Sequence, residues 1–497
     1  MRYVVALDQG TTSSRAIVFD EAGRIVAAQG REFRQIYPHP GWVEHDPKDI
    51  LQSQVEALRA AVAAAGVDVR DIAAIGITNQ RETTLMWDKQ TGEAVCGAIV
   101  WQCRRTAPLV ERLLREGMEA AIRERTGLVP DAYFSGTKMQ WILQEIPGVR
   151  ARAERGELCA GTVDSFLVYH LTNERAHVTD ATNASRTMLL NIRSMEWDEE
   201  LLRAMEIPRA ILPQVVDSSQ VVGTLKADIL GRAIPVAALV GDQQSALFGQ
   251  GCVRPGMTKN TYGTGCFMLM STGTSLVRSA NNLVTTVARR VDGHVSYALE
   301  GSVFVAGAAV QWLRDEMGLI QNAAESEKVA ASLPNNAGVY FVPAFTGLGA
   351  PHWDMYGRGT ILGLTRGTGR AHIVRAALES IAYQSREVLD CMARDSGLKP
   401  SSLRVDGGAS ANNFLMQFQA DILGMEVARP AVTETTALGA AMLAGRAIGL
   451  WSDAQLATLW QADKRFTPSM PEARRAQYMH EWGRAVERAK AWVEEET

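Results

Sequence analysis

The sequence predicts an α/β protein with two domains. Its 497 residues are enough for two to four domains of ~100–200 residues, each able to bury a core of its own. The first part of the chain follows the order strand, strand, strand, helix, strand. Beyond residue 234, short apolar strands again precede glycine-rich loops. The halves are not visibly alike in sequence, so the predicted duplication depends on this order of elements.

The composition is that of a folded, water-soluble protein. Hydrophobic residues make up 46% and charged residues 21%, which excludes wholesale disorder and a coiled coil. The 51 basic and 55 acidic residues form no block of like charge, so we expect neither a nucleic-acid partner nor membrane insertion. The six cysteines form no C-x-x-C pair, and the apolar run before Asp8 is too short for a signal peptide. These features predict a cytoplasmic protein.

The N-terminal elements are predicted by apolar patterning between turn residues. Asp46 and Pro47 provide an N-cap and a first-turn proline for a helix that ends at Gly66. The apolar segment Ile72–Thr78 then fits a buried parallel strand, reached by crossing over that helix. The three strands of the preceding meander are predicted at Tyr3–Leu7, Arg15–Phe19 and Arg24–Ala28.

The later elements are predicted in the same way. One strand ends at Gly241-Asp242, which places a carboxylate at a strand end. In chain order, the predicted elements are the strands Pro235–Val240, Lys259–Tyr262 and Cys266–Met270, a helix through Ile373 and Met392 that ends at Gly397, and the strand Leu403–Val405.

The loop from Asp8 to Arg15 has a composition suited to polyphosphate. Gly10 permits a tight turn, Arg15 adds a cation, and the Asp8 carboxylate could orient Mg²⁺ through its waters. The alternative for this short motif is a polar hairpin with ordinary turn chemistry. The hydroxyl side chains of Thr11, Thr12 and Ser13 follow Gly10 in the loop.

Two further glycine-rich loops strengthen the phosphate interpretation. Gly263-Thr264-Gly265 offers a second turn that could contact phosphate, and the small residues from Gly407 to Asn412 would let an adenosine approach the backbone. Each loop alone is also explained as a tight connection between elements. Their joint occurrence with the Asp8 loop and Gly241-Asp242-Gln243-Gln244 favours a nucleotide-dependent enzyme.

Taken together, these motifs resemble the FGGY family of carbohydrate kinases, in particular its glycerol-phosphorylating members. The resemblance covers essentially the whole chain. It implies two RNase-H-like domains of the actin/hexokinase/Hsp70-like ATPase fold around a central cleft, with an N-terminal domain at 1–246 and a C-terminal domain at 247–497. The motifs that carry it are Asp8 to Arg15, Asn79 to Thr83, Trp101 to Thr106, Tyr133 to Lys138, Gly241 to Gln244 and Gly359 to Glu379.

The resemblance also implies the roles of individual residues. Asp242 is expected to accept the proton of the attacking hydroxyl, with Mg²⁺ near Asp8. Glycerol is expected to contact Arg81, Glu82, Tyr133, Asp242 and Gln243, with Trp101 and Phe267 along its carbon edge. ATP is expected to contact Thr11, Thr12, Ser13, Arg15, Thr264, Gly307, Gln311, Gly408 and Asn412.

Structural alternatives exist for several of these residues. Asp242 could cap a helix beginning near Gln243, and Gly307 could serve only helix packing. Without the resemblance, ordinary core positions would be favoured for three aromatic residues, Trp101, Tyr133 and Phe267.

The expected reaction is ATP-dependent phosphorylation of glycerol to sn-glycerol 3-phosphate. Two alternatives stay open: an FGGY kinase for a pentulose or another polyol, and an actin-like ATPase with no small-molecule acceptor. Gln80-Arg81-Glu82 and Trp101 favour glycerol, since the sugar-specific members of the family that this chain resembles generally carry different residues at those positions. A homodimer or homotetramer is expected by analogy alone.

Overall fold

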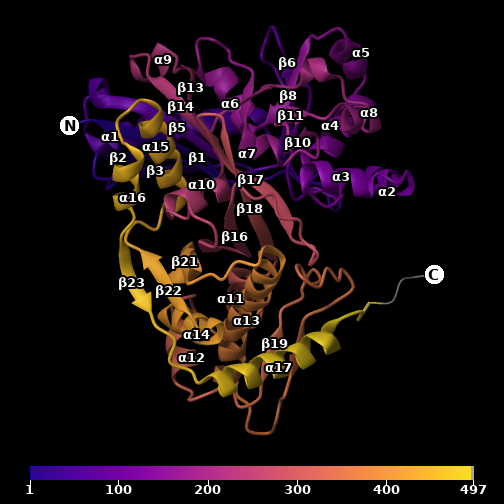
Figure 1. Ribbon diagram of the computed structural model, residues 1–497, viewed down its shortest axis with the longest axis vertical. Helices are drawn as coiled ribbons and strands as arrows, with labels where there is room; N and C mark the ends of the chain where they lie inside the picture. Colours follow the sequence, from indigo (N-terminus) through magenta and orange to yellow (C-terminus); the bar gives the residue numbers. More distant parts are fainter. Residues whose placement is uncertain (494–497) are drawn as a thin grey trace. The chain divides into compact units, whose positions relative to one another are not determined.

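The computed structural model describes residues 1–493, in two compact units (Figure 1). Unit 1 comprises Met1–Gly251, Thr285–Ala298 and Thr435–Trp460. Unit 2 comprises Cys252–Val284, Leu299–Glu434 and the chain from Gln461. The chain therefore returns to unit 1 twice after first leaving it. The domain division predicted between residues 246 and 247 stays a prediction.

Unit 1 is built on a six-stranded sheet with the order β13-β14-β5-β1-β2-β3. Strands β1 to β3 form the predicted antiparallel meander, while β5 runs parallel to both β1 and β14. Asn79 of β5 pairs with Gln9 of β1 and with Gly241 of β14, so these three strands end side by side. The strands are β1 (Tyr3–Gln9), β2 (Ser13–Asp20), β3 (Ile25–Glu32), β5 (Ile72–Asn79), β13 (Ser219–Thr224) and β14 (Pro235–Gly241).

Helices cover both faces of this sheet. On one face, α1 (Pro47–Ala65) and α6 (Val163–Leu171) share a buried apolar cluster with Val5, Leu7 and Ile75. The opposite face lies against α15 (Thr435–Ala447). There a Cβ added to Gly76 would lie 2.3 Å from a carbonyl oxygen of α15, so a glycine permits this close approach.

The start and end of α1 follow from the predicted signals. The Asp46 side chain accepts a hydrogen bond from the Lys48 amide, Pro47 is the first residue of the helix, and Gly66 ends it in the left-handed conformation with φ of 63°.

The remaining elements of unit 1 surround this sheet. A four-stranded sheet has the order β4-β7-β6-β8, and two further pairs are β10 with β11 and β12 with β9. Their strands are β4 (Glu44–His45), β6 (Thr84–Asp88), β7 (Ala98–Ile99), β8 (Leu158–Thr162), β9 (Val178–Asp180), β10 (Leu190–Asn191), β11 (Glu196–Trp197) and β12 (Gln214–Val216). The other helices are α2 (Ala107–Arg115), α3 (Glu119–Thr126), α4 (Ser135–Glu145), α5 (Val149–Glu154), α7 (Ala181–Ala184), α8 (Glu199–Ala204), α9 (Ala227–Leu230), α10 (Asp242–Gly249) and α16 (Asp453–Leu459).

Unit 2 has its own sheet, in which β18, β16, β15, β21, β22 and β23 are neighbours in that order. The strands are β15 (Thr258–Tyr262), β16 (Cys266–Gly273), β18 (His294–Val303), β21 (Ser402–Asp406), β22 (Glu426–Pro430) and β23 (Ala462–Phe466), with a separate pair of β19 (Tyr340–Val342) and β20 (Thr360–Leu362). β17 (Val284–Val291) belongs to unit 1 except for its first residue, and the first half of β18 also belongs to unit 1.

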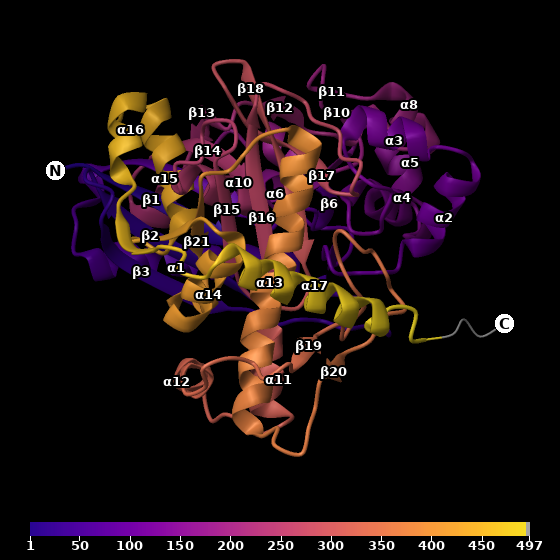
Figure 2. The ribbon, with the colours of Figure 1, turned by 60° about the horizontal axis from the view of Figure 1, so that its bottom comes forward.

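The core of unit 2 surrounds one long helix, α13 (Arg370–Ser396), which Figure 2 shows crossed by α17 (Glu472–Ala489). Tyr383 of α13 stacks on Trp482 of α17 with ring centroids 5.2 Å apart. Gly397 ends α13 in the left-handed conformation, as predicted. The other helices of this unit are α11 (Gly307–Asp315), α12 (Glu325–Ala331) and α14 (Asn413–Leu423).

The sequence-based strands and helices are all present. Each predicted strand extends by one to a few residues at one or both ends, as β5 does to Asn79 and β16 to Gly273. The predicted start of the third strand at Arg24 was one residue early, because β3 begins at Ile25. The alternative of a helix cap at Asp242 does not hold: Gly241 is the N-cap of α10, and Asp242 is the first helical residue. Within residues 1–493, no helix combines the length and the apolar character needed to cross a membrane.

Candidate functional site

Asp242 lies at the carboxyl end of β14 and is ion-paired with Arg81. The Arg81 Nε lies 3.0 Å from the Asp242 Oδ1, which also accepts a hydrogen bond of 2.7 Å from the Gln243 amide. A Cβ on Gly241 would come within 2.8 Å of the Arg81 side chain, so the glycine makes room for this pairing. Arg81 is almost fully buried, whereas the Asp242 side chain is 30% exposed. A fixed cation therefore holds a carboxylate that solvent can reach.

Glu82 is held in an uncommon backbone conformation, with φ of 61°. Its side chain is buried, and the Arg186 Nε donates to its Oε1 at 2.6 Å. Its backbone carbonyl accepts a hydrogen bond from the Ser135 hydroxyl at 3.0 Å. Strain of this kind persists only where the surroundings fix the conformation, and here buried polar contacts do so.

Trp101 and Tyr133 form an aromatic wall beside these charged groups. Their rings meet edge to face with centroids 5.6 Å apart, and the guanidinium of Arg186 lies 5.7 Å from the centroid of Tyr133. The Trp101 indole N–H donates to the Thr11 hydroxyl at 2.9 Å. Both aromatic residues are half-buried and belong to no core cluster described above, so the core alternative does not describe them.

The loop from Asp8 to Arg15 is a tight hairpin between β1 and β2. The Gly10 amide donates to the Ser13 carbonyl at 2.9 Å, and Arg15 pairs with Asp8 at 3.3 Å. Gln80 connects this loop to the Arg81 segment, because its side-chain amide donates to the Gly10 carbonyl at 3.0 Å. The hairpin alternative is thus correct for the backbone. Hydroxyl side chains nevertheless lie at its tip, and the carboxylate of Asp8 and the cation of Arg15 lie on the paired strands beside it.

The predicted residues of unit 1 therefore form one connected group. Arg81 contacts Asp242, Arg186 joins Glu82 to Tyr133, and Trp101 joins Tyr133 to Thr11. The members of this group are Asp8, Thr11, Arg15, Arg81, Glu82, Trp101, Tyr133, Asp242 and Gln243. Thr12 and Ser13 lie in the same hairpin.

In unit 2, the Gly263-Thr264-Gly265 turn is fixed against the first residues of α11 by backbone contacts. The Gly307 amide donates to the Gly263 carbonyl at 3.0 Å, and the Ala308 amide donates to the Thr264 carbonyl at the same distance. A Cβ on Gly307 would lie 2.5 Å from the Gly263 carbonyl oxygen. The packing alternative for Gly307 is therefore correct at this contact, and it leaves the side chains of Thr264 and Gln311 exposed.

The loop from Gly407 to Asn412 is also in unit 2. Gly407 has φ of 83°, and its Cβ would lie 2.5 Å from the Tyr262 carbonyl oxygen, whereas a Cβ on Gly408 would face open space. Asn412 caps α14 by accepting a hydrogen bond from the Leu415 amide at 2.9 Å. Phe267 is half-buried on β16, and its carbonyl accepts a hydrogen bond from Lys259 at 3.2 Å.

Buried charges support the unit 1 group, and sequence analysis did not assign them. Lys138 is fully buried, donates to the carbonyls of Tyr133 and Phe134, and has its pKa lowered to about 7 by burial. Burial, with the charge of Asp180, raises the pKa of Asp164 to about 6. The sequence does not show that these charged side chains are buried, because most Lys, Arg and Asp side chains in proteins are exposed.

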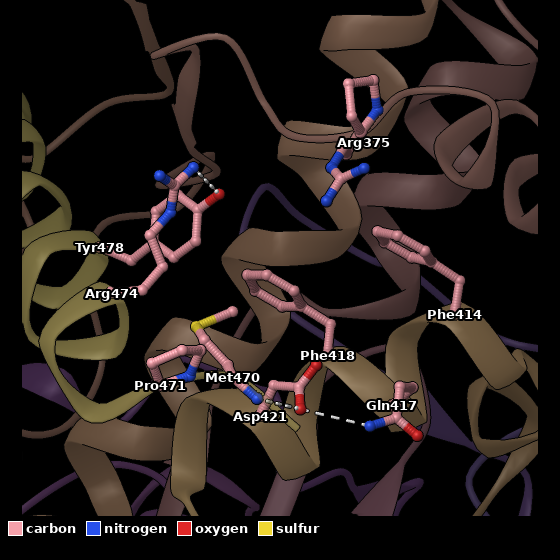
Figure 3. Close-up of a pocket in the computed structure, with 10 residues that line it drawn as sticks. Arg375, Phe414, Gln417, Phe418, Asp421, Met470, Pro471, Arg474 and Tyr478 are labelled. Carbon is pink, nitrogen blue, oxygen red and sulfur yellow. Dashed lines mark hydrogen bonds between the residues drawn. The ribbon is translucent and has the colours of Figure 1, made fainter. Parts of the chain in front are cut away.

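Unit 2 also contains an open cavity of about 520 Å³, between α13, α14 and α17 (Figure 3). None of the residues predicted to contact the nucleotide lines it. Its polar side chains are engaged with neighbours: Arg375 with Glu379 at 2.6 Å, and Arg474 with the Tyr478 hydroxyl at 3.0 Å. The cavity is separate from the predicted site residues of its unit.

Comparison with known proteins identifies the family. The model of the FGGY carbohydrate kinase N-terminal domain matches residues 3–249, and that of the C-terminal domain matches residues 258–448. The chain belongs to the FGGY family of carbohydrate kinases. It is 61% identical over 493 residues to glycerol kinase 2 of Thermotoga maritima, covering 99% of each chain.

Solved structures agree with this assignment. A glycerol kinase of Plasmodium falciparum with ADP has a TM-score of 0.93 at 36% identity, covering 98% of each chain. A ligand-bound xylulose kinase of Lactobacillus acidophilus has a TM-score of 0.88 at 23% identity, covering 98% of this chain and 97% of the other. The second match shows the fold alone. The predicted two-domain fold of the actin/hexokinase/Hsp70-like type is confirmed.

Proposed function

We propose that this FGGY kinase transfers the γ-phosphoryl group of ATP to glycerol, forming sn-glycerol 3-phosphate and ADP. The observation that carries the proposal is the contact between Arg81 and Asp242, beside Glu82 and the Trp101–Tyr133 wall. A small triol needs charged groups for its hydroxyls and an apolar edge for its carbons. The identity to glycerol kinases supports the same acceptor.

In this proposal Asp242 is the general base. Its carboxylate accepts the proton of the attacking glycerol hydroxyl as that oxygen bonds to the γ-phosphorus and the bond to the ADP oxygen breaks. The proton then passes from Asp242 to solvent, which reaches this side chain. Arg81 fixes the carboxylate and contributes hydrogen bonds to the acceptor, with Glu82 and Gln243 binding the other hydroxyls.

The nucleotide would contact two sets of residues. The hairpin hydroxyls and Arg15 suit phosphate oxygens, and the loops at Thr264 and Gly408 suit the remainder of the nucleotide. Mg²⁺ would neutralise phosphate charge, and a single carboxylate with water and phosphate ligands fits its usual coordination, which Asp8 can provide. Within residues 1–493, no group of three or more His, Cys, Asp and Glu side chains could hold a metal. A cytoplasmic location and a dimeric or tetrameric assembly remain predictions.

The test is to measure ADP formation with and without glycerol and to identify the product by phosphorus NMR. We expect ADP and sn-glycerol 3-phosphate in equal amounts, with little ADP when glycerol is absent. ADP formation that does not depend on any acceptor would support the actin-like ATPase instead.

The alternative of a pentulose acceptor is less well supported. The xylulose kinase match is at 23% identity and carries the fold only. Faster turnover of a ketose than of glycerol would favour this alternative.

A further inference from the structure

The short segment from Asp180 to Arg186, which contains α7, is buried behind the proposed glycerol site. All seven of its residues are nearly or fully inaccessible to solvent. None of them was predicted as a site residue. The segment nevertheless makes three contacts at the two strand ends that carry Arg81, Glu82 and Asp242, and each contact is a hydrogen bond or ion pair to a specific atom.

The first contact is made by Thr182. The Gly241 amide donates to the Thr182 Oγ1 at 2.8 Å, immediately before Asp242. The same hydroxyl donates to the Asp180 Oδ1 at 2.8 Å, which fixes the direction of its proton and leaves a lone pair facing Gly241. The start of α10, and with it the Asp242 backbone, is therefore tied to a buried carboxylate through one hydroxyl.

The second and third contacts reach the other strand end. Asn183 and Asn79 exchange two amide hydrogen bonds of 3.0 and 3.1 Å, and Asn79 is the residue before Gln80-Arg81. Arg186 then pairs with Glu82 at 2.6 Å. Asn79 and Gly241 are paired neighbours in the sheet, so the segment spans the two strand ends from which Arg81 and Asp242 extend.

Asp180 joins these contacts. Its Oδ1 accepts hydrogen bonds from the Asn183 amide and side chain, at 3.0 and 2.9 Å, as well as from Thr182. Its Oδ2 accepts from the Thr182 amide at 3.0 Å and from the Ser218 hydroxyl at 2.7 Å. Because both oxygens of the Asp180 carboxylate accept several hydrogen bonds, the side chain is held in one orientation. The donors that bind it are held in place by the same contacts.

We infer that Thr182, oriented by Asp180, is a positioning residue for the proposed general base: it sets where Asp242 stands relative to Arg81 and the acceptor hydroxyl. This inference rests on the proposed function. A misplacement of about 1 Å at a general base can cost on the order of 10²-fold in rate, because proton acceptance needs hydrogen-bond distance at the moment of attack.

The test compares three variants with the wild-type full-length protein. Thr182→Val keeps the shape but removes the oxygen that accepts from Gly241, and Thr182→Ser keeps that oxygen. Thr126→Val is the matched control, because this buried hydroxyl also accepts from a backbone amide, that of Leu128 at 3.1 Å, at the end of α3. Each variant is assayed for kcat and for the KM values of glycerol and ATP, and hydrogen exchange is measured at the Gly241 amide.

We expect Thr182→Val to lower kcat/KM for glycerol by ~10-fold, the usual worth of one hydrogen bond, with the KM of ATP unchanged. Exchange at the Gly241 amide should rise in the same variant. Thr182→Ser and Thr126→Val should stay within ~3-fold of wild type, although Thr126→Val loses comparable stability.

Three results would overturn the inference: native kinetics in Thr182→Val, an equal kinetic loss in Thr126→Val, or no rescue by Thr182→Ser. If Thr182→Val does not fold, Ser218→Ala, which removes one donor to Asp180 from outside the segment, should give a smaller kinetic loss of the same kind. Unchanged kinetics in Ser218→Ala would then count against the inference. A wild-type protein without glycerol-dependent ADP formation would instead contradict the proposed function. Hydrogen exchange at the Gly241 amide would still test its hydrogen bond to Thr182 in that case.

Discussion

The proposed glycerol site of unit 1 and the glycine loops of unit 2 are held in shape by different contacts. In unit 1, charged side chains pair with one another, as Arg81 does with Asp242 and Arg186 does with Glu82. In unit 2, a backbone amide meets a carbonyl directly where Gly307 donates to Gly263, and this close approach leaves no room for a Cβ on Gly307. The two ion pairs of unit 1 should therefore be sensitive to the loss of a charged group, and the turn of unit 2 to the gain of volume at Gly307.

The largest effect should follow from removing the charge at Asp242. Asp242→Asn keeps the size of the side chain but cannot accept the proton, so kcat should fall by ~10²–10⁴-fold with the KM of ATP little changed. Steady-state kinetics on the purified variant provide the measurement. A variant with near-native kcat would remove Asp242 from the role of base.

The next effect concerns the cation beside it. Arg81→Ala removes charged hydrogen bonds to the acceptor, so glycerol binding should weaken by ~1.5–3 kcal/mol. Titration calorimetry with glycerol measures this directly. An unchanged affinity would place the acceptor pocket elsewhere in the protein.

The corresponding test in unit 2 is to add side-chain volume at a glycine. Gly307→Ala would place a Cβ 2.5 Å from the Gly263 carbonyl oxygen, so the turn must shift, at a cost of about 1–3 kcal/mol in the free energy of unfolding. The KM of ATP should rise, while glycerol affinity stays native.

Gly483→Ala is the matched control for this substitution. It lies in α17, and its added Cβ meets nothing within 4 Å, so it should stabilise the helix slightly and leave ATP kinetics unchanged. If both alanine variants have the same KM for ATP, the close approach at Gly307 does not matter for nucleotide binding.

The smallest effect is a pH dependence of stability in unit 1. Burial beside Asp180 raises the pKa of Asp164 to about 6, from 3.8. The folded state therefore keeps this proton to higher pH than the unfolded state, and its contribution to stability is lost as the pH rises through about 6.

Asp164→Asn cannot ionise and should escape that loss. Its free energy of unfolding, relative to that of wild type, should increase between pH 4 and 7 by on the order of 1 kcal/mol, because only the wild type loses stability as the pH rises. Urea unfolding at both pH values measures this change. A difference between the two proteins that does not vary with pH would mean that Asp164 has an ordinary pKa.

The sequence predicted most of the fold, because its signals are local. Asp46 and Gly66 mark the ends of α1, and the apolar segment at Ile72 gives β5. The buried contacts that hold the site residues in place could not be predicted in the same way. Thr182 and Arg186 act through partners far along the chain, Gly241 and Glu82, and their burial depends on tertiary packing.

The position of Asp242 shows the same limit on a smaller scale. A cap and the first helical residue differ by one position, and carboxylates are common at both. Only the backbone angles of Gly241 distinguish them.

The most direct test of the account is a steady-state assay over a panel of acceptors, with ATP fixed and ADP release measured. The panel should include glycerol, other small polyols, xylulose and related ketoses, and a sample with no acceptor. The account predicts that kcat/KM is highest for glycerol, by at least ~10-fold over any ketose, and that ADP release without an acceptor is slow. A ketose that is turned over more efficiently than glycerol, or ADP release that no acceptor stimulates, would contradict it.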